Sequence, residues 1–466
     1  MEISQERLEK MTPKERQMAT GNIPKTVLAF SIPTVIGMFV QAMYVFVDRL
    51  FVGMIPDVGD DALSGLSLAS PVVFIVGAFS LLIGVGAAVN ISIRLGKGDR
   101  EGADKVVSNA LTLNLISAVV IGVLGIVFLE PLLIAFGASD ATLPFADTYM
   151  RIKLYGIFFT FISFSMNHPI RAAGNAKRFA SAQLLGGLLN IGLNPLFIFG
   201  FNMGIAGAAW STVLAQSISA AWVMVYYFRG KPAIRIRPAL MKLDPKIVMT
   251  IASIGIAPFL MQLLGSAVTI IANTLIRDFG GDHAIGAFGA VGAMMSLFIM
   301  PVFGITQGSN PIIGFNYGMG DMERVRKAYF SAAAYSVGVC VVGLIFIATL
   351  TDPLMWLFTS DPAVHAIGVN GIRIIVWTMP IAAFQMNAGT FFMGLGRAKI
   401  SVLLSVLRQG IILIPLYFIL PQFMEIDGVW MAAPAADLIA FTITILMVSR
   451  ELRRLKKMGV QGPQAA

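Results

Sequence analysis

The amino-acid sequence predicts an all-α membrane protein: twelve transmembrane helices in two six-helix lobes, related by a parallel pseudo-two-fold repeat. Of the 466 residues, 57% are hydrophobic and only 13% are charged, whereas about a quarter of the residues of soluble proteins are charged. The apolar runs are about 20 residues long and lack the strict alternation of barrel strands. Several short motifs also recur at a nearly constant distance along the chain. A chain this apolar needs lipid as its solvent, with every backbone polar group paired inside helices.

The apolar runs define the expected spans. They cover residues 26–52, 64–90, 107–129, 147–170, 179–200, 205–228, 247–276, 284–315, 328–350, 364–392, 400–420 and 429–449. Because their number is even, both ends of the chain are expected on the same side of the membrane. The residues before the first span mix charges and lack the apolar core of a signal peptide, so we expect a surface segment there.

Basic residues mark the cytoplasmic side. Of the 34 Lys and Arg residues, 28 lie in the two tails and in every second loop. Those loops are 91–106, 171–178, 229–246, 316–327 and 393–399. The positive-inside rule therefore predicts that both termini are cytoplasmic. The net charge of +9 does not indicate nucleic acid as a partner, because the basic residues are confined to these short segments between apolar runs.

The two halves of the chain repeat each other. The matching pairs are Pro33 with Pro258 and Asp48 with Asn273, 225 residues apart, and GKGD (96–99) with GMGD (318–321) and GNAK (174–177) with GRAK (396–399), 222 residues apart. Since each half has an even number of spans, both halves enter the membrane from the same side, which makes the repeat parallel. A substrate is then expected between the lobes, and rocking of the lobes is the hypothesis for alternating access.

The repeat and the charge pattern predict the domain organisation. The expected parts are a cytoplasmic N-terminal segment (1–24), an N-lobe (25–228), a cytoplasmic linker (229–246), a C-lobe (247–450) and a cytoplasmic C-terminal tail (451–466). The linker contains six basic residues and three prolines, at the middle of the chain.

Polar residues recur on one face of several apolar helices. The stripes are Gly37, Gln41, Tyr44 and Asp48 in span 1; Gln183, Gly187, Asn190 and Asn194 in span 5; Thr212, Gln216 and Ser219 in span 6; and Gln262, Ser266, Thr269 and Asn273 in span 7. Their spacing places each set on one helix face. Because polar groups avoid lipid, these faces are predicted to point into the bundle. They form either hydrogen bonds between helices or a pocket for a small cation or proton.

Two acidic residues lie clearly within spans, Asp48 and Asp437. A carboxylate inside a membrane is a functional-site hypothesis by default. Asp48 has no basic residue on its own stripe, since Arg49 points about 100° away around the helix. We therefore predict that Asp48 couples transport to an ion. Asp437 and Arg408 have expected depths that differ by only about 5 Å, so they are predicted to pair, either as a structural salt bridge or with a gating or binding role.

Other parts of the composition are less specific. The single cysteine, Cys340, excludes a disulfide within the chain. The 26 methionines and 33 phenylalanines are compatible with an adaptable apolar cavity, but such residues more often face lipid or pack against protein.

Three motifs resemble the multidrug and toxic compound extrusion (MATE) family, in particular its bacterial multidrug exporters. They are VDRLFVG (47–53), NIGLNPLFIFGFNMGIAGAAWST (190–212) and GITQGSNPIIGFNYGMG (304–320), and the resemblance extends over residues 25–450. It implies a secondary antiporter that exports organic, cationic amphiphilic compounds in exchange for Na⁺ or H⁺. It further implies a multi-pass protein of the bacterial cytoplasmic (inner) membrane, a monomer, with no cofactor other than the coupling ion.

The resemblance also assigns residues. The cation or proton site of the first lobe would consist of Asp48, Asn190, Asn194 and Thr212, with Na⁺ as a candidate ligand. Candidates for the substrate cavity are Gln41, Tyr44, Gln183, Gln216, Gln262, Asn273, Gln307, Asn310 and Gln385. Asn194 stands where the family often has an aspartate, and the acidic residue that some members carry in span 7 is absent. Asp437, after the proline of WMAAPAAD, resembles one bacterial branch, and Arg408 is its expected partner.

Three alternatives remain. A lipid-linked precursor flippase of the same superfamily would need a broad cationic groove, and few basic residues lie within the spans. A membrane-embedded transferase would need a catalytic motif such as HxxxxD or DxD, which the sequence lacks. A passive channel would need a ring of charges or a filter-like loop, and no span repeats one.

Overall fold

The computed structural model describes residues 5–229 and 232–461, and within these ranges the secondary structure is helical, without strands. The first half contains α1 (Gln5–Glu9), α2 (Pro13–Thr20), α3 (Ile23–Gly53), α4 (Gly59–Lys97), α5 (Arg100–Val127), α6 (Leu129–Ala135), α7 (Leu143–Tyr155), α8 (Ile157–Ser165), α9 (Asn167–Ala172), α10 (Ala176–Pro195), η1 (Leu196–Gly200) and α11 (Gly204–Phe228). The second half contains η2 (Pro238–Leu240), α12 (Pro245–Met319), α13 (Met322–Thr349), α14 (Thr351–Phe358), α15 (Pro362–Ile375), η3 (Val376–Thr378), α16 (Met379–Gly394), α17 (Ala398–Val406), η4 (Leu407–Leu413), α18 (Ile414–Ile419) and α19 (Pro421–Gln461).

The predicted all-α membrane fold is confirmed. Within the described residues, eleven helices are long and apolar enough to cross a membrane, counting α12 as two helices that meet at Gly281. The expected span 147–170 is built differently, from the three short helices α7, α8 and α9. The first break lies at Gly156, where a Cβ atom would come within 2.6 Å of the Val213 side chain. The close approach of α11 thus requires a glycine at this break.

The chain forms two compact units. The N-unit consists of Gln5–Arg16 and Ile36–Phe259, and the C-unit consists of Gln17–Val35 and the residues from Leu260 onwards. The chain therefore passes between the units after Arg16 in α2, after Val35 in α3 and after Phe259 in α12. The last two crossings lie close to the repeat-related Pro33 and Pro258. The units differ from the expected lobes by the stretches 25–35 and 229–259, and the lobe boundaries expected from the sequence stay a prediction.

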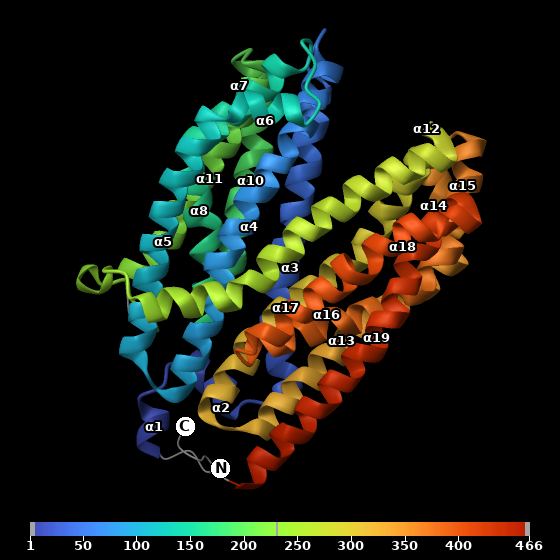
Figure 1. Cartoon of the computed structure of the whole chain (residues 1–466). Helices are drawn as coiled ribbons and strands as arrows, with labels where there is room; N and C mark the ends of the chain where they lie inside the picture. The colour runs from blue at the N-terminus through green and yellow to red at the C-terminus, as the bar shows by residue number, and fades with distance from the viewer. Residues whose placement is uncertain (1–4, 230–231, 462–466) are drawn as a thin grey trace. The chain divides into compact units, whose positions relative to one another are not determined.

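Helices of the N-unit pack along one another. Within it, α10 packs against α11, and α4 packs against α5, α7 and α9 (Figure 1). Gly187 of α10 allows a close approach to α3, because a Cβ atom there would lie 2.6 Å from Val40 Cγ1. This contact holds the polar stripes of α3 and α10 beside each other.

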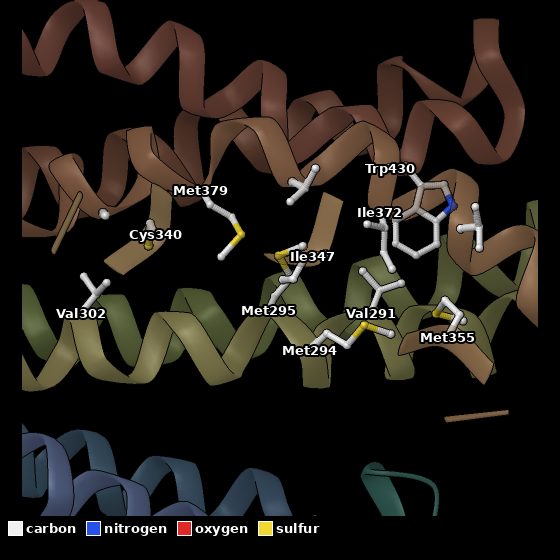
Figure 2. Close-up of a cluster of buried hydrophobic side chains, with 13 residues drawn as sticks. Val291, Met294, Met295, Val302, Cys340, Ile347, Met355, Ile372, Met379 and Trp430 are labelled. Atoms are coloured by element: carbon white, nitrogen blue, oxygen red, sulfur yellow. The ribbon is translucent and has the colours of Figure 1, made fainter. Parts of the chain in front are cut away.

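Methionines fill the core of the C-unit. Met294, Met295, Met355 and Met379 are buried together with Trp430 in one apolar cluster (Figure 2). Flexible thioether side chains fill irregular gaps between helices. For these four methionines, packing rather than the lining of a cavity is the observed role.

The repeated motifs adopt the same turn in both halves. Gly98 and Gly320 each have a φ of 84°, in the left-handed region that favours glycine. The aspartate that follows each glycine caps the next helix: Asp99 accepts a hydrogen bond from Gly102 N at 2.8 Å, and Asp321 accepts one from Arg324 N at 3.0 Å. The sequence repeat therefore corresponds to a structural repeat.

The expected linker, 229–246, is bound along α5 over its described part. Asp104 accepts a hydrogen bond from Arg235 N at 2.7 Å and pairs with Arg237 Nε at 2.9 Å. Asn109 donates to Leu240 O at 3.0 Å, and Asp244 pairs with Lys105 at 2.7 Å. The basic linker is thus held within the N-unit by two carboxylates and an amide.

Candidate functional site

Asp48 forms the centre of a buried polar network in the N-unit. Its side chain lies on α3 and is 7% exposed. Asn194 of α10 donates from Nδ2 to Asp48 Oδ1 at 2.9 Å, and the same Nδ2 lies 3.3 Å from Asn190 Oδ1. A buried carboxylate needs such donors, because unpaired charge in a protein interior or membrane is costly.

The network continues into α11. Asn190 donates from Nδ2 to Thr212 Oγ1 at 3.0 Å, and Ser211 donates its hydroxyl to Asn194 Oδ1. Thr212 in turn donates to Ala208 O at 2.9 Å. The four residues assigned from the sequence are therefore brought together by the fold, and Ser211 is an additional member that the sequence analysis did not single out.

Two further residues near Asp48 were missed, and both lie on α7. The hydroxyl of Tyr149 interacts with the Asp48 carboxylate and with Thr212. Lys153 lies one turn further along α7, with its Nζ 5.3 Å from the centre of the Tyr149 ring. Asp48 is the acidic group whose charge acts on Lys153. Lys153 lies on another helix than Asp48, so the periodicity of the Asp48 helix gave no indication of it.

The spacing of the charged residues in α7 could have shown that Lys153 lies on a different side of the helix from Asp147 and Arg151. Asp147 and Arg151 are four residues apart and pair at 2.6 Å. Tyr149 and Lys153 have the same spacing, shifted by two residues, which places them on the opposite side of the helix. One pair therefore uses the more exposed side of α7, and the other faces Asp48.

In this arrangement the side-chain oxygens around Asp48 are engaged in hydrogen bonds within the network. The side-chain oxygens of Asn190, Asn194 and Thr212 each accept a hydrogen bond from a neighbour in the network. Asp48 accepts a hydrogen bond from the Nδ2 group of Asn194. It is therefore the amide nitrogen of Asn194, and not the amide oxygen, that contacts the carboxylate. Among the described residues, no group of three or more His, Cys, Asp or Glu side chains is arranged to hold a metal ion. The site is a hydrogen-bonded carboxylate rather than a cage of free oxygens.

A second charged group lies in the C-unit. Arg408 Nε is 2.5 Å from Asp437 Oδ1, and the two side chains are 29% and 4% exposed. Gln385 donates from Nε2 to Asp437 O at 2.7 Å. Arg408 belongs to η4, a stretch of π-helix inside the span, and π-helical turns are frequent at functional sites. The predicted contact between Arg408 and Asp437 is present, and its role stays a prediction.

The remaining cavity candidates are divided between the two units. In the N-unit, Thr160 donates to Gln216 at 2.5 Å, while Gln41, Tyr44 and Gln183 are partly buried. In the C-unit, Asn310 donates to Thr390 O at 3.2 Å, Gln262 and Gln307 are partly buried, and Asn273 is exposed. A cavity of about 500 Å³ in the C-unit is lined by Asn22, Arg324, Lys327 and neighbouring residues, and none of the candidates line it. Their role in binding a substrate stays a prediction.

The chain resembles known proteins over most of its length. A family model described as MatE matches residues 33–196 and 254–419, one segment in each half. The multidrug export protein MepA of Staphylococcus aureus (strain MRSA252) is 25% identical over 425 residues, which cover 91% of this chain and 93% of that protein. MepA of Staphylococcus saprophyticus is 22% identical over 428 residues, covering 92% and 94%.

Solved structures agree with the family model. A multidrug resistance MATE family transporter of the MOP superfamily, in its outward-facing conformation, matches with a TM-score of 0.90 and 26% identity, covering 96% of this chain and 100% of that chain. A MOP superfamily transporter from Pyrococcus furiosus, described as having a binding pocket of reverse polarity, matches with a TM-score of 0.89 and 25% identity, covering 96% and 99%. The likeness therefore extends over both halves of the chain.

Proposed function

Because the chain belongs to the MatE family of membrane transporters, and is therefore a transporter rather than an enzyme, we propose that it exports organic, cationic amphiphilic compounds in exchange for Na⁺ or H⁺. The relatives named multidrug export proteins support the export of drugs by this chain. Their bacterial origin supports a place in the bacterial cytoplasmic membrane. In this proposal both termini are cytoplasmic and the transporter works as a monomer.

The observation that carries the proposal is the burial of Asp48 within a polar network inside an apolar bundle. Burying such a carboxylate destabilises the fold, and membrane proteins keep a buried carboxylate where transport uses its charge. A bound cation or proton neutralises the carboxylate, and release of the ion leaves a charge that the Asn194 amide stabilises at 2.9 Å. The two states differ in charge at one point of the N-unit. Ion exchange at Asp48 is therefore suited to driving a change of conformation.

The division into two compact units supports alternating access by rocking. The chain crosses from one unit to the other close to Pro33 and Pro258. Prolines inside spans remove a backbone hydrogen bond and permit bending. Under this proposal the substrate is bound by polar side chains such as Gln41 and Tyr44, and a change of conformation exposes it to the outside.

The test is efflux of ethidium from proteoliposomes that contain the purified transporter, with a Na⁺ gradient and a proton gradient imposed separately. Efflux driven by either gradient is expected and identifies the coupling ion. Empty liposomes with the same gradients provide the control. Efflux under neither gradient contradicts the proposal and favours a lipid-linked precursor flippase, which movement of a fluorescent lipid pyrophosphate across the bilayer would then reveal.

A further inference from the structure

Lys153 is a cation placed beside the Asp48 network. It is partly buried on α7, with its ammonium 5.3 Å from the Tyr149 ring centre. The face of an aromatic ring attracts an ammonium group, most strongly where water is scarce. Tyr149 is 4% exposed and its hydroxyl interacts with Asp48. The ring thus holds the ammonium, and the hydroxyl of the same side chain reaches the carboxylate.

An ammonium inside a membrane protein needs a compensating charge. Among the described residues Lys153 forms no direct salt bridge, and Asp48 is the acidic group that acts on it. The neighbouring cation on α7, Arg151, already has its own partner in Asp147 at 2.6 Å. Arg49 also acts on Asp48, but its side chain is exposed. Asp48 and Lys153 are therefore the two opposite charges that Tyr149 links.

The charge balance of this site decides which ions it accepts. Asp48 contributes one negative charge and Lys153 one positive charge, while Asn190, Asn194 and Thr212 are neutral. An alkali cation entering the site would meet an ammonium group, with no net negative charge to offset the loss of its water. The oxygens of Asn190, Asn194 and Thr212 are also occupied by hydrogen bonds. The charge balance is therefore unfavourable for Na⁺, and each oxygen that bound it would do so in addition to a hydrogen bond it already accepts.

We propose that Lys153 is the resident counter-cation of Asp48 and that it excludes Na⁺ from this site. Lys153 is then a residue that determines the specificity for the coupling ion. The inference rests on the proposed function, in which Asp48 is the coupling residue, and it narrows the choice of ion at Asp48 by removing Na⁺.

The experiment measures binding of Na⁺ to the purified full-length transporter in detergent, by isothermal titration with NaCl against choline chloride at constant ionic strength. The wild type and Lys153→Arg are expected to show no saturable Na⁺ binding. Lys153→Met keeps the apolar stem and removes the charge, so saturable Na⁺ binding is expected, at concentrations at least about tenfold below the highest at which the wild type shows none. Arg151→Gln is the matched control, because it removes the same charge from the opposite side of α7 and is expected to behave as the wild type.

A second variant tests the same inference if Lys153→Met does not fold. Asn194→Asp adds a carboxylate next to Asp48 while Lys153 is kept, which also gives the site a net negative charge. Gain of Na⁺ binding in this variant supports the inference. The inference is overturned by Na⁺ binding in the wild type, by an equal gain in Arg151→Gln, or by no gain in either site variant.

The binding experiment is independent of transport. If the wild type exports no ethidium under either gradient, the proposed function fails, while the comparison of Na⁺ affinities still decides the role of Lys153. If a proton gradient drives efflux and Lys153→Met fails to acquire Na⁺ binding, the proposed function stands and this inference fails.

Discussion

Arg408 and Asp437 form a charge pair inside the C-unit, with 2.5 Å between Arg408 Nε and Asp437 Oδ1. The Asp437 side chain is 4% exposed, and the Arg408 side chain is 29% exposed. Removing one partner of a buried pair leaves a charge without compensation, whereas replacing both partners with apolar residues is often nearly neutral. Single substitutions therefore measure the cost of leaving one charge unpaired, and the double substitution measures the net contribution of the pair to stability.

Arg408→Gln is expected to destabilise the transporter by about 3 kcal/mol, because it leaves the deeply buried Asp437 unpaired. Asp437→Asn is expected to cost less, since Arg408 has some access to its surroundings. The double variant Arg408→Met with Asp437→Leu should recover most of the loss. Thermal unfolding in detergent measures all three.

The exposed pair Lys327 and Glu323, at 2.6 Å, provides the comparison. Lys327→Gln is expected to change stability by less than about 0.5 kcal/mol, because exposed ion pairs are weak. If Arg408→Gln unfolds at the same temperature as Lys327→Gln, the pair has no structural role.

Asp48→Asn is expected to abolish gradient-driven efflux while leaving the transporter folded. The amide of an asparagine has nearly the shape of the carboxylate and can still accept a hydrogen bond from Asn194, so the network is kept while the exchangeable charge is lost. Ethidium efflux from proteoliposomes and thermal unfolding check the two parts. Asp60→Asn removes the same charge at an exposed position and should retain efflux. Unchanged efflux in Asp48→Asn would remove Asp48 from the mechanism.

Much of the fold was predictable because a segment that crosses lipid must be apolar and must pair its backbone polar groups within a helix. Long apolar runs located eleven spanning helices, and the motifs GKGD and GMGD identified turns that have the same glycine conformation in both halves. The close packing that excludes a larger side chain at the Gly156 break was not predictable, because the atoms it would meet belong to Val213, in a distant part of the chain.

The candidate site was predictable to the extent that it follows helix periodicity. The stripe Asn190 and Asn194 repeats every turn, and the fold brings it to Asp48. Lys153 was missed because its relevance depends on which face of α7 meets Asp48, and that is a tertiary contact. The buried Arg408–Asp437 contact was predictable from depth alone, since both residues need a partner within the membrane.

The attachment of the linker to α5 is expected to weaken at low pH. The hydrogen bond from Lys105 and the backbone N–H of Lys246 hold the pKa of Asp244 below its ordinary value of 3.8. A lowered pKa in the folded state means that the contact stabilises the fold above the ordinary value and is lost as the pH falls through the lowered one. Hydrogen exchange of residues 238–246, corrected for intrinsic rates, should stay constant between about pH 5 and 7 and increase below about pH 4.

Asp244→Asn should show the faster exchange of the linker already at pH 7, because the amide forms a weaker bond with Lys105 than the carboxylate does. Asp140→Asn, at an exposed position between α6 and α7, is the control and should leave the linker unchanged. Equal exchange in both variants at pH 7 would show that Asp244 does not hold the linker.

The N-terminal segment is expected to depend on Glu15. This carboxylate is 2% exposed, accepts a hydrogen bond from Thr12 N at 2.6 Å and pairs with Arg100 at 2.6 Å. The first contact is half of a capping box for α2, and the second binds the segment to the N-unit. Glu15→Ala removes both, so faster hydrogen exchange of residues 5–16 is expected, with an effect of about 1–3 kcal/mol on their local opening. Glu15→Gln keeps the cap and loses the charge, which should give an intermediate rate. Glu6→Ala, which breaks the exposed pair with Lys10, should change little, and equal rates in Glu6→Ala and Glu15→Ala would mean that other contacts hold the segment.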